Sequence, residues 1–301
     1  MGYDKEYFDS EEFQELLSSY EAAVAEGNYP FLDADDLVDI ADYYNMSGNH
    51  DKAVAAATHA LDLFPNATLP NVFMAREALA NNDLKGAQQC AEAIEDKDDP
   101  DYYYLQAELL IAEGKPKDAD RSLQEYAKTV PADEYEDFLN DCVDLYMYYG
   151  LYQEVQHFYN ELLDINPYSS EYWNALASAQ FLNEQYSDAV TSSEYSLAIN
   201  PKDTEALAIK GSAMIQLDNV EEAVKYLRRY AEIVPDDYPF MAACCYELGY
   251  PEEFLFFLKI ACENDPEGTV MSLGRLFPED MEVKDYYAYM EEQLRVHPEE
   301  H

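Results

Sequence analysis

A spacing of twelve residues, repeated along the chain, constrains the fold more than any other feature. Residues 172–201 carry a small residue at Ala177, another at Ala189 twelve places later, and Pro201 after twelve more. The same frame recurs as Ala41, Ala53 and Pro65; Ala75 and Ala87, with Pro100 one place late; Ala107, Ala119 and Pro131; Val143, Val155 and Pro167; Gly211, Ala223 and Pro235; and Ala242, Phe254 and Pro266. The chain has only 14 prolines, so this recurrence is not chance. It predicts seven units of about 34 residues each over residues 34–268.

Each unit is predicted to form two helices. In the first unit Leu37, Ile40 and Tyr44 fall on one helical face. Seven residues after the first small position, most units have a residue type that tolerates a left-handed backbone and so ends a helix: Gly48, Asn82, Gly114, Gly150, Asp218 or Gly249. Glu184 is the exception, and we expect that turn to be closed differently. The proline then stops the second helix of the unit.

One helix pair cannot bury its apolar face alone, whereas stacked pairs can. We therefore expect an all-α solenoid of antiparallel helix pairs, with small residues where paired helices touch and Trp173 as a packing residue. Residues 1–33 and 269–301 are expected to cap its ends. Asp9 and Glu12 form a capping-box pattern before a first amphipathic helix. Residues 270–277 and 283–296 are predicted to form two last helices.

The repeat resembles the tetratricopeptide repeat. The resemblance rests on the period, on the stretch WNALASA at 173–179 followed by Ala189 and Pro201, and on Tyr44 and Tyr146 at the aromatic position. It implies a right-handed superhelical solenoid of about seven repeats between caps. It also implies that the first helices of successive repeats line a concave groove that binds partner peptides. Phe254, in place of a small residue, departs from the pattern, as does the early end of the second unit in EDKDDPD.

The charge of the chain restricts its partners. With 63 acidic and 18 basic residues, the formal net charge is −45. Nucleic acid and anionic membrane surfaces are excluded as expected partners, because binding either begins with neutralising phosphates. A cationic partner is favoured, since long-range attraction speeds its encounter. The competing interpretation is that the acidic surface serves solubility alone.

The remaining composition points to a protein of a reducing compartment. Five cysteines, odd in number and without a CxxC pair, indicate reduced buried thiols. The start of the chain lacks a signal-peptide pattern, and no apolar run is long enough to cross a bilayer. We expect a cytoplasmic monomer without cofactor or metal. No motif of a phosphate loop, zinc protease or nucleophile elbow occurs, so catalysis is not expected.

The resemblance allows the groove lining to be predicted residue by residue. The positions of a carboxylate clamp, found in one subgroup of the family, hold Val38, Asp42, Phe73, Asp101 and Leu105 here, so that clamp is absent. The N-terminal half of the groove is expected to be acidic, with Arg76 as its lone basic residue. Its acidic residues are Asp35, Asp39, Asp42, Asp101, Glu108, Asp137, Asp141 and Asp144, and Tyr104 and Tyr148 are candidate aromatic anchors. The C-terminal half is expected to be neutral and more apolar, and it includes Asn174, Ser178, Phe181, Ile215, Phe240 and Tyr246.

Two functions follow from these predictions. The first is a non-catalytic adaptor or scaffold that binds a protein segment with basic residues at one end and apolar anchors at the other. The alternative is a receptor for a glycan or small molecule that stacks on some of the 28 tyrosines. A further open point is whether the last two helices fold back over the apolar half of the groove.

Overall fold

A computed structural model describes residues 5–28, 30–278 and 281–296 of the chain. In these ranges the secondary structure is helical, and no residue is in a strand. None of the described helices has the length and apolar character needed to cross a membrane. The chain divides into two compact units, residues 1–150 (unit 1) and 151–301 (unit 2), and each is described by itself. The predicted all-α class with paired helices is confirmed.

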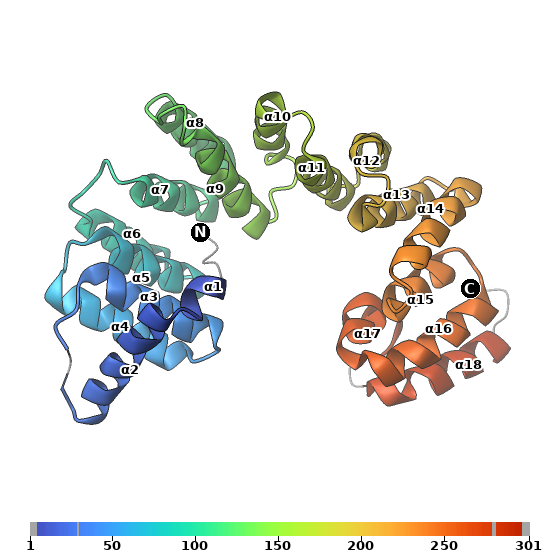
Figure 1. Cartoon of the computed structure of the whole chain (residues 1–301), viewed down its shortest axis with the longest axis horizontal. Helices are drawn as coiled ribbons and strands as arrows, with labels where there is room; N and C mark the ends of the chain where they lie inside the picture. Colours follow the sequence, from blue (N-terminus) through green and yellow to red (C-terminus); the bar gives the residue numbers. More distant parts are fainter. Residues whose placement is uncertain (1–4, 29, 279–280, 297–301) are drawn as a thin grey trace. The chain divides into compact units, whose positions relative to one another are not determined.

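Unit 1 begins with two helices, α1 and α2, and continues with the first and second helices of successive pairs in alternation (Figure 1). They are α1 (Lys5–Phe8), α2 (Glu11–Ala25), α3 (Ala34–Met46), α4 (His50–Leu63), α5 (Thr68–Ala80), α6 (Leu84–Ala93), α7 (Pro100–Ala112), α8 (Pro116–Ala127) and α9 (Tyr135–Tyr148). The pairs α3–α4, α5–α6 and α7–α8 pack against each other, and α3, α5 and α7 also contact one another in succession. Side by side, these first helices present one face of unit 1.

The start of unit 1 is capped by aromatic packing. The rings of Phe8 and Phe13 meet edge to face at 4.8 Å, and Tyr43 of α3 lies 5.3 Å from Phe13. The predicted capping residue was wrong by one place: the N-cap of α2 is Ser10, whose side chain accepts a hydrogen bond from the Phe13 backbone N–H. A serine hydroxyl serves this role as well as a carboxylate does.

Unit 2 contains α10 (Gln156–Ile165), α11 (Ser170–Leu182), α12 (Tyr186–Ile199), α13 (Thr204–Gln216), α14 (Val220–Ile233), α15 (Tyr238–Glu247), α16 (Pro251–Asn264), α17 (Pro266–Leu273) and α18 (Tyr286–Val296). Two 3₁₀ turns, η1 (Gly274–Leu276) and η2 (Val283–Asp285), precede α18. The pairs α11–α12, α13–α14 and α15–α16 pack together. The second helix of the fourth predicted repeat starts late, because residues 152–155 form a turn and α10 begins only after Val155.

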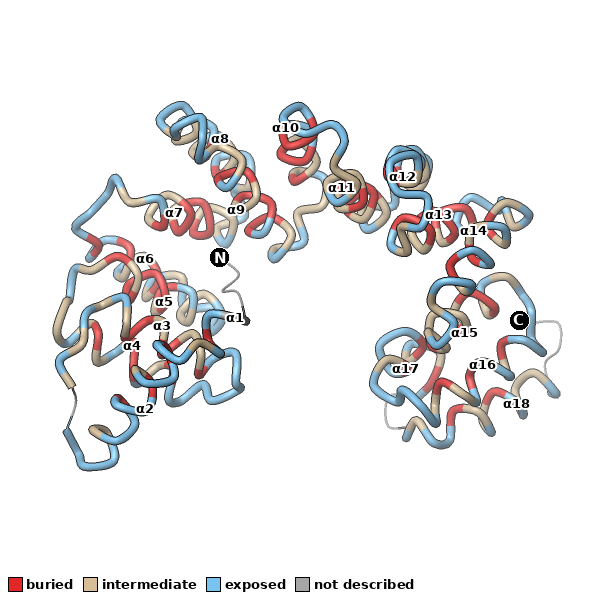
Figure 2. Tube along the Cα trace, in the orientation of Figure 1, coloured by how far each residue is buried: buried red, intermediate tan, exposed pale blue. Residues whose placement is uncertain are grey.

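The small positions lie where paired helices touch. Ala41, Ala53, Ala177 and Ala189 are completely buried, and Figure 2 shows buried residues along the facing sides of the pairs. At Gly211 of α13, an added Cβ would lie 2.6 Å from a methyl carbon of Leu227 in α14. The helices therefore approach too closely for a larger residue there. Trp173 stacks 4.4 Å from the Tyr195 ring, and its indole N–H is donated to the Pro167 carbonyl.

Part of the acidic surplus closes helix ends. Six aspartates stand at N-caps and accept a backbone N–H of the first turn through their side chains: Asp33, Asp83, Asp99, Asp203, Asp237 and Asp265. A carboxylate at this place both pairs a free N–H and faces the positive end of the helix dipole. These charges are thus explained by local structure and need no ligand.

The turns between paired helices all use a left-handed residue, including the one expected to differ. Glu184 has φ +60°, close to Asn82 and Asp218 at +58° and to the glycines. The following residue, Gln185, donates its backbone N–H to the Gln180 carbonyl at 2.8 Å, as Asn219 does to Met214 at 2.9 Å. The prediction of a different closure was wrong. The packing of α11 against α12 determines the conformation of the turn, so Glu184 adopts the left-handed backbone although its residue type disfavours it.

Replacing Glu184 with glycine should stabilise unit 2 by about 0.5–1 kcal/mol. A left-handed conformation costs a residue with a side chain about 1–2 kcal/mol. Glycine avoids this cost but loses more conformational entropy on folding, which offsets roughly half of the gain. Glu171→Gly is the matched control, because Glu171 is exposed in the first turn of α11, where glycine only weakens the helix. Urea unfolding followed by circular dichroism measures both. Equal destabilisation by the two variants would contradict strain at Glu184.

The last helices close unit 2 as a cap. Phe277 stacks on Tyr286 with ring centroids 3.6 Å apart, and both join a core with Phe254, Leu258 and other residues of α15 to α18. The stretches predicted as the two last helices overlap α17 and α18, but α17 begins and ends four residues before the predicted 270–277, and η1 and η2 occupy part of both stretches. Tyr246 packs against this core, so one predicted groove residue is taken up by the C-terminal cap.

Candidate acidic pocket and groove faces

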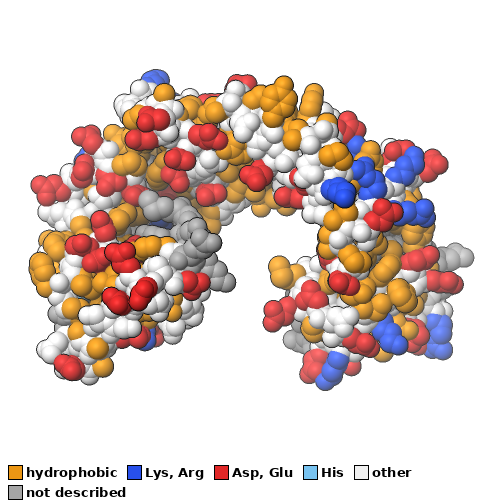
Figure 3. Space-filling model, in the orientation of Figure 1, with side chains coloured by type: hydrophobic (Ala, Val, Ile, Leu, Met, Phe, Trp, Pro, Cys, Tyr) orange, Lys and Arg blue, Asp and Glu red, His pale blue; other side chains and the backbone are white. Residues whose placement is uncertain are grey.

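The candidate site of unit 1 lies on the first helices. Asp35, Asp39 and Asp42 come from α3, and Asp101, Tyr104 and Glu108 come from α7. Asp137, Asp141, Asp144 and Tyr148 come from α9. Figure 3 shows acidic side chains spread over unit 1 on the face in view. Burial, and then the charges of Asp33 and Asp39, raise the pKa of Asp35.

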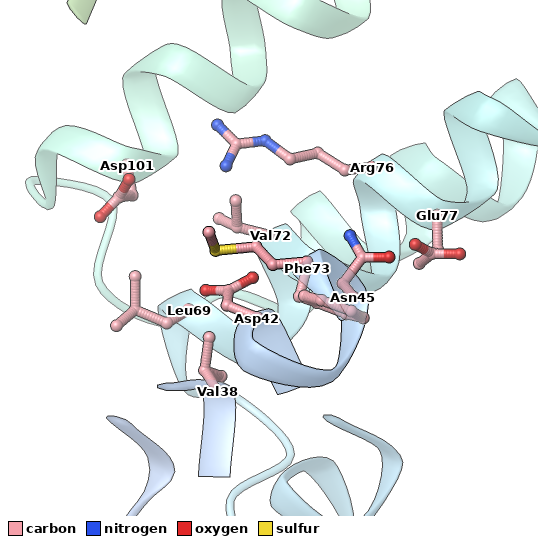
Figure 4. A pocket seen from close by; sticks show the side chains of 10 residues that line it. Val38, Asp42, Asn45, Leu69, Val72, Phe73, Arg76, Glu77 and Asp101 are labelled. Atoms are coloured by element: carbon pink, nitrogen blue, oxygen red, sulfur yellow. The ribbon is translucent and has the colours of Figure 1, made fainter. Parts of the chain in front are cut away.

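A pocket of ≈ 280 Å³ lies between α3, α5 and α7. Its apolar lining consists of Val38, Met46, Leu69, Val72 and Phe73, and its polar lining of Asp42, Asn45, Arg76, Glu77 and Asp101. In Figure 4 the side chains of Asp42, Asp101 and Arg76 reach toward this space from three different helices. The pocket thus combines an apolar floor with carboxylates on its walls.

Asp101 is the buried carboxylate of this pocket. It lies in the first turn of α7, where the Asp99 side chain accepts its backbone N–H, and the residue is only 8% exposed. Burial first, and then the charge of Asp99, raises the pKa of Asp101 to about 6, although the nearby Arg76 opposes the shift. The ionised form is therefore poorly stabilised at neutral pH.

The one basic residue predicted on this face makes its hydrogen bonds to Glu108 and not to Asp101. Arg76 donates from Nε and from a terminal nitrogen to the same oxygen of Glu108, at 2.8 and 2.6 Å. Glu108 is 3% exposed, so a buried charge is neutralised there. The predicted acidic residue Glu108 consequently serves as the internal partner of Arg76. On the far side of the pocket Glu77 contacts the His50 imidazole at 3.1 Å.

The aspartates of α9 form a second acidic surface on unit 1. Asp137 and Asp144 are exposed and Asp141 is half-buried. Burial raises the pKa of Asp141, while a hydrogen bond from Tyr104 opposes this shift. Tyr104 itself is buried and stacks at 6.2 Å on Phe138, whereas Tyr148 is 80% exposed. Of the two predicted aromatic anchors in unit 1, Tyr148 is the accessible one.

The predicted residues of unit 2 are less exposed than an open site requires. Asn174 of α11 is buried, and Ser178, Phe181, Ile215 and Phe240 are half-buried. Phe181 meets the Tyr186 ring at 5.4 Å and Phe240 meets the Tyr230 ring at 4.9 Å, both edge to face. These rings already have partners from the second helices, so only part of each is offered to a ligand.

Several pocket residues were not anticipated from the sequence. Leu69 stands four residues before Phe73, and Val72 stands four residues before Arg76, so all four share one face of α5. That spacing was available as a signal. Met46 and Glu77 lie near the ends of their helices, where the groove face is harder to assign. Within the described part of the chain, no group of three or more His, Cys, Asp or Glu side chains could hold a metal ion.

Comparison with known proteins identifies the repeat. Residues 174–238 match the family model of the tetratricopeptide repeat. This segment spans α11 to α14, so the resemblance deduced from the spacing is confirmed there. Repeats of this kind generally mediate protein–protein interaction or scaffolding. No curated protein sequence matches the chain.

Solved structures share a helical arrangement with this chain at low identity. PilF of Pseudomonas aeruginosa is 13% identical with a TM-score of 0.45, and the match covers 67% of this chain and 92% of that one. MamA of Desulfovibrio magneticus RS-1 is 13% identical with a TM-score of 0.37, over 56% and 98% of the two chains. MamA AMB-1 is 14% identical with a TM-score of 0.37, over 55% and 90%. Similarities at this level carry no conclusion about the partner.

Proposed function

We propose that the protein is a non-catalytic adaptor that binds a basic segment of another protein on the first-helix face of unit 1. For unit 2 by itself, the exposed parts of Phe181, Ile215 and Phe240 would pack against apolar side chains of a partner. The observation that carries the proposal is the pocket between α3, α5 and α7, whose apolar floor is bordered by Asp42 and Asp101 from separate helices.

The charge distribution supports a cationic partner. No lysine or arginine occurs between Lys128 and Lys202, so the three aspartates of α9 have no basic residue on their own helix. Opposed charges on the first-helix face are limited to Arg76, which is already paired with Glu108. An approaching basic segment therefore meets attraction and little repulsion. Such attraction acts mainly on the rate of association, whereas buried apolar contacts hold the complex together.

Neutralising the α9 surface should slow association. Replacing Asp141 and Asp144 together with asparagine is expected to lower the association rate about threefold at low salt and to flatten its salt dependence. The probe is a surface-bound peptide of alternating lysine, leucine and glycine, and surface-plasmon kinetics at low and high salt give the rates. Phe181→Ala or Phe240→Ala should instead speed dissociation.

The matched control removes two charges from unit 1 away from this face. Asp51 and Asp62 are both exposed on α4, a second helix, and their double replacement with asparagine should leave the association rate nearly unchanged. The proposal fails if the association rate of the wild-type protein does not change with salt and if both double variants associate as fast as the wild type. The acidic surface would then serve solubility alone.

A further inference from the structure

We propose that the pocket between α3, α5 and α7 receives one lysine side chain of the partner, with Asp101 as the counter-ion of its ammonium group. The inference rests on the proposed function and deepens it, because it assigns one anchoring side chain to one pocket. It also makes binding dependent on the ionisation of Asp101, which distinguishes it from general attraction by an acidic surface.

The isolation of Asp101 is the observation that points to a ligand. A buried carboxylate is ordinarily paired, since an unpaired one loses its hydration without compensation. Asp101 is more than nine-tenths buried and lines the pocket, yet no side chain among the described residues is found hydrogen-bonded or ion-paired to it. Arg76, the cation on the same pocket, is held by Glu108. A cation from outside would complete the site.

The walls of the pocket suit lysine better than arginine. Val38, Val72 and Phe73 are buried apolar side chains that can cover the four-carbon stem of a lysine. An ammonium is a compact charge with three rotatable donors, so it can approach the Asp101 carboxylate of α7 from within the pocket. A planar guanidinium would instead bring a second large cation beside the guanidinium of Arg76.

Several charged groups act on Asp101, and together they set its response to pH. Asp99 precedes it, Arg76 faces it from α5, and Asp141 faces it from α9. Tyr126 lies near it on α8, and Asp42 and Glu77 border the same pocket. Burial disfavours the ionisation of Asp101 most, the neighbouring carboxylates add to this effect, and Arg76 opposes it, which leaves a pKa of about 6. His50, bound to Glu77, would add positive charge at the rim when protonated.

Lysine binding should therefore weaken as the pH falls. An ammonium binds the ionised form of Asp101, which predominates at about pH 8 and drops to roughly a tenth at about pH 5. The affinity should fall about tenfold between these values, and binding near pH 6 should release about half a proton per site. Isothermal titration calorimetry with the soluble lysine–leucine–glycine peptide, in two buffers of different ionisation enthalpy, measures both quantities.

Three comparisons isolate the pocket. Asp101→Asn should bind the peptide about tenfold more weakly at about pH 8 and lose most of the pH dependence, whereas Asp62→Asn should behave as wild type. His50→Gln should keep the pH dependence, because the transition belongs to Asp101. A peptide with acetylated lysines should not bind, and this arm needs no variant to fold. A peptide with arginine in place of lysine should bind more weakly than the lysine peptide.

The outcomes separate this inference from the proposed function. If the lysine peptide binds without pH dependence and Asp101→Asn binds it equally well, the pocket assignment is overturned while the adaptor proposal stands. Equal or tighter binding of the arginine peptide would overturn the choice of lysine. If neither basic peptide binds at any pH, the proposed function fails and this inference falls with it.

Discussion

Replacing Ala189 with tryptophan is expected to destabilise unit 2 by about 3 kcal/mol or more, enough to remove much of its stability. Ala189 is completely buried in the first turn of α12, at the contact with α11. The only ways to admit an indole there are to part the two helices or to force neighbouring side chains from their rotamers. Ala177→Trp, on the α11 side, should act in the same way.

The stability of Trp173→Phe is the control for the two alanine variants. Trp173 is the larger and more conspicuous residue, but it is half-buried and stacks on Tyr195 near the surface. Phenylalanine keeps most of the ring contact and loses one hydrogen bond to the Pro167 carbonyl, which costs about 1 kcal/mol. Chemical denaturation of the three variants decides between them. Similar midpoints would show that the small positions are not tight contacts.

The repeat frame could be predicted from the sequence because its cause is local and periodic. Alanine or glycine at fixed distances is demanded by helix contact, and proline by helix termination, so both leave a mark in every unit. The sequence-based prediction was wrong where packing between helices overrides the backbone preference of a residue type. Glu184 takes a left-handed backbone that its residue type disfavours, because α11 and α12 pair around it.

Other departures have a similar origin. Ser10 and Asp9 are both good N-cap residues, so sequence alone could not choose between neighbours. The late start of α10 follows from residues 152–155 forming a turn, although Val155 keeps the repeat position. Residue type identifies a helix end only within about one or two places.

The candidate site was only partly predictable, because the sequence shows which face a residue is on but not how deeply it lies. Asp42, Asp101 and Arg76 were placed on one face, and the structure brings them to one pocket. That Glu108 binds Arg76, and that no side chain of the described residues pairs with Asp101, depends on side chains of different helices meeting in space. Periodicity along one helix contains no such information.

Phe254→Ala tests whether the repeat frame or the packing controls the C-terminal end. The change introduces the small residue that the frame favours, yet we expect it to destabilise unit 2 by about 3–5 kcal/mol. Phe254 is 1% exposed, lies 5.3 Å from the Tyr246 ring, and forms one core with Leu273, Phe277 and Tyr286. The cap helices α17 and α18 contribute to that core, so alanine would leave a cavity beneath them.

Phe256 provides the control on the same helix. It is 60% exposed, and its ring contacts Phe257, so Phe256→Ala should cost less than about 0.5 kcal/mol. Hydrogen exchange of the α17 and α18 amides, together with urea unfolding, reports where the structure loosens. Because a cavity at Phe254 removes contacts of both cap helices, their amides should exchange faster in that variant while those of α11 and α12 stay protected. Equal stability of the two variants would mean that the small residue fits at this position and that the cap helices are held by other contacts.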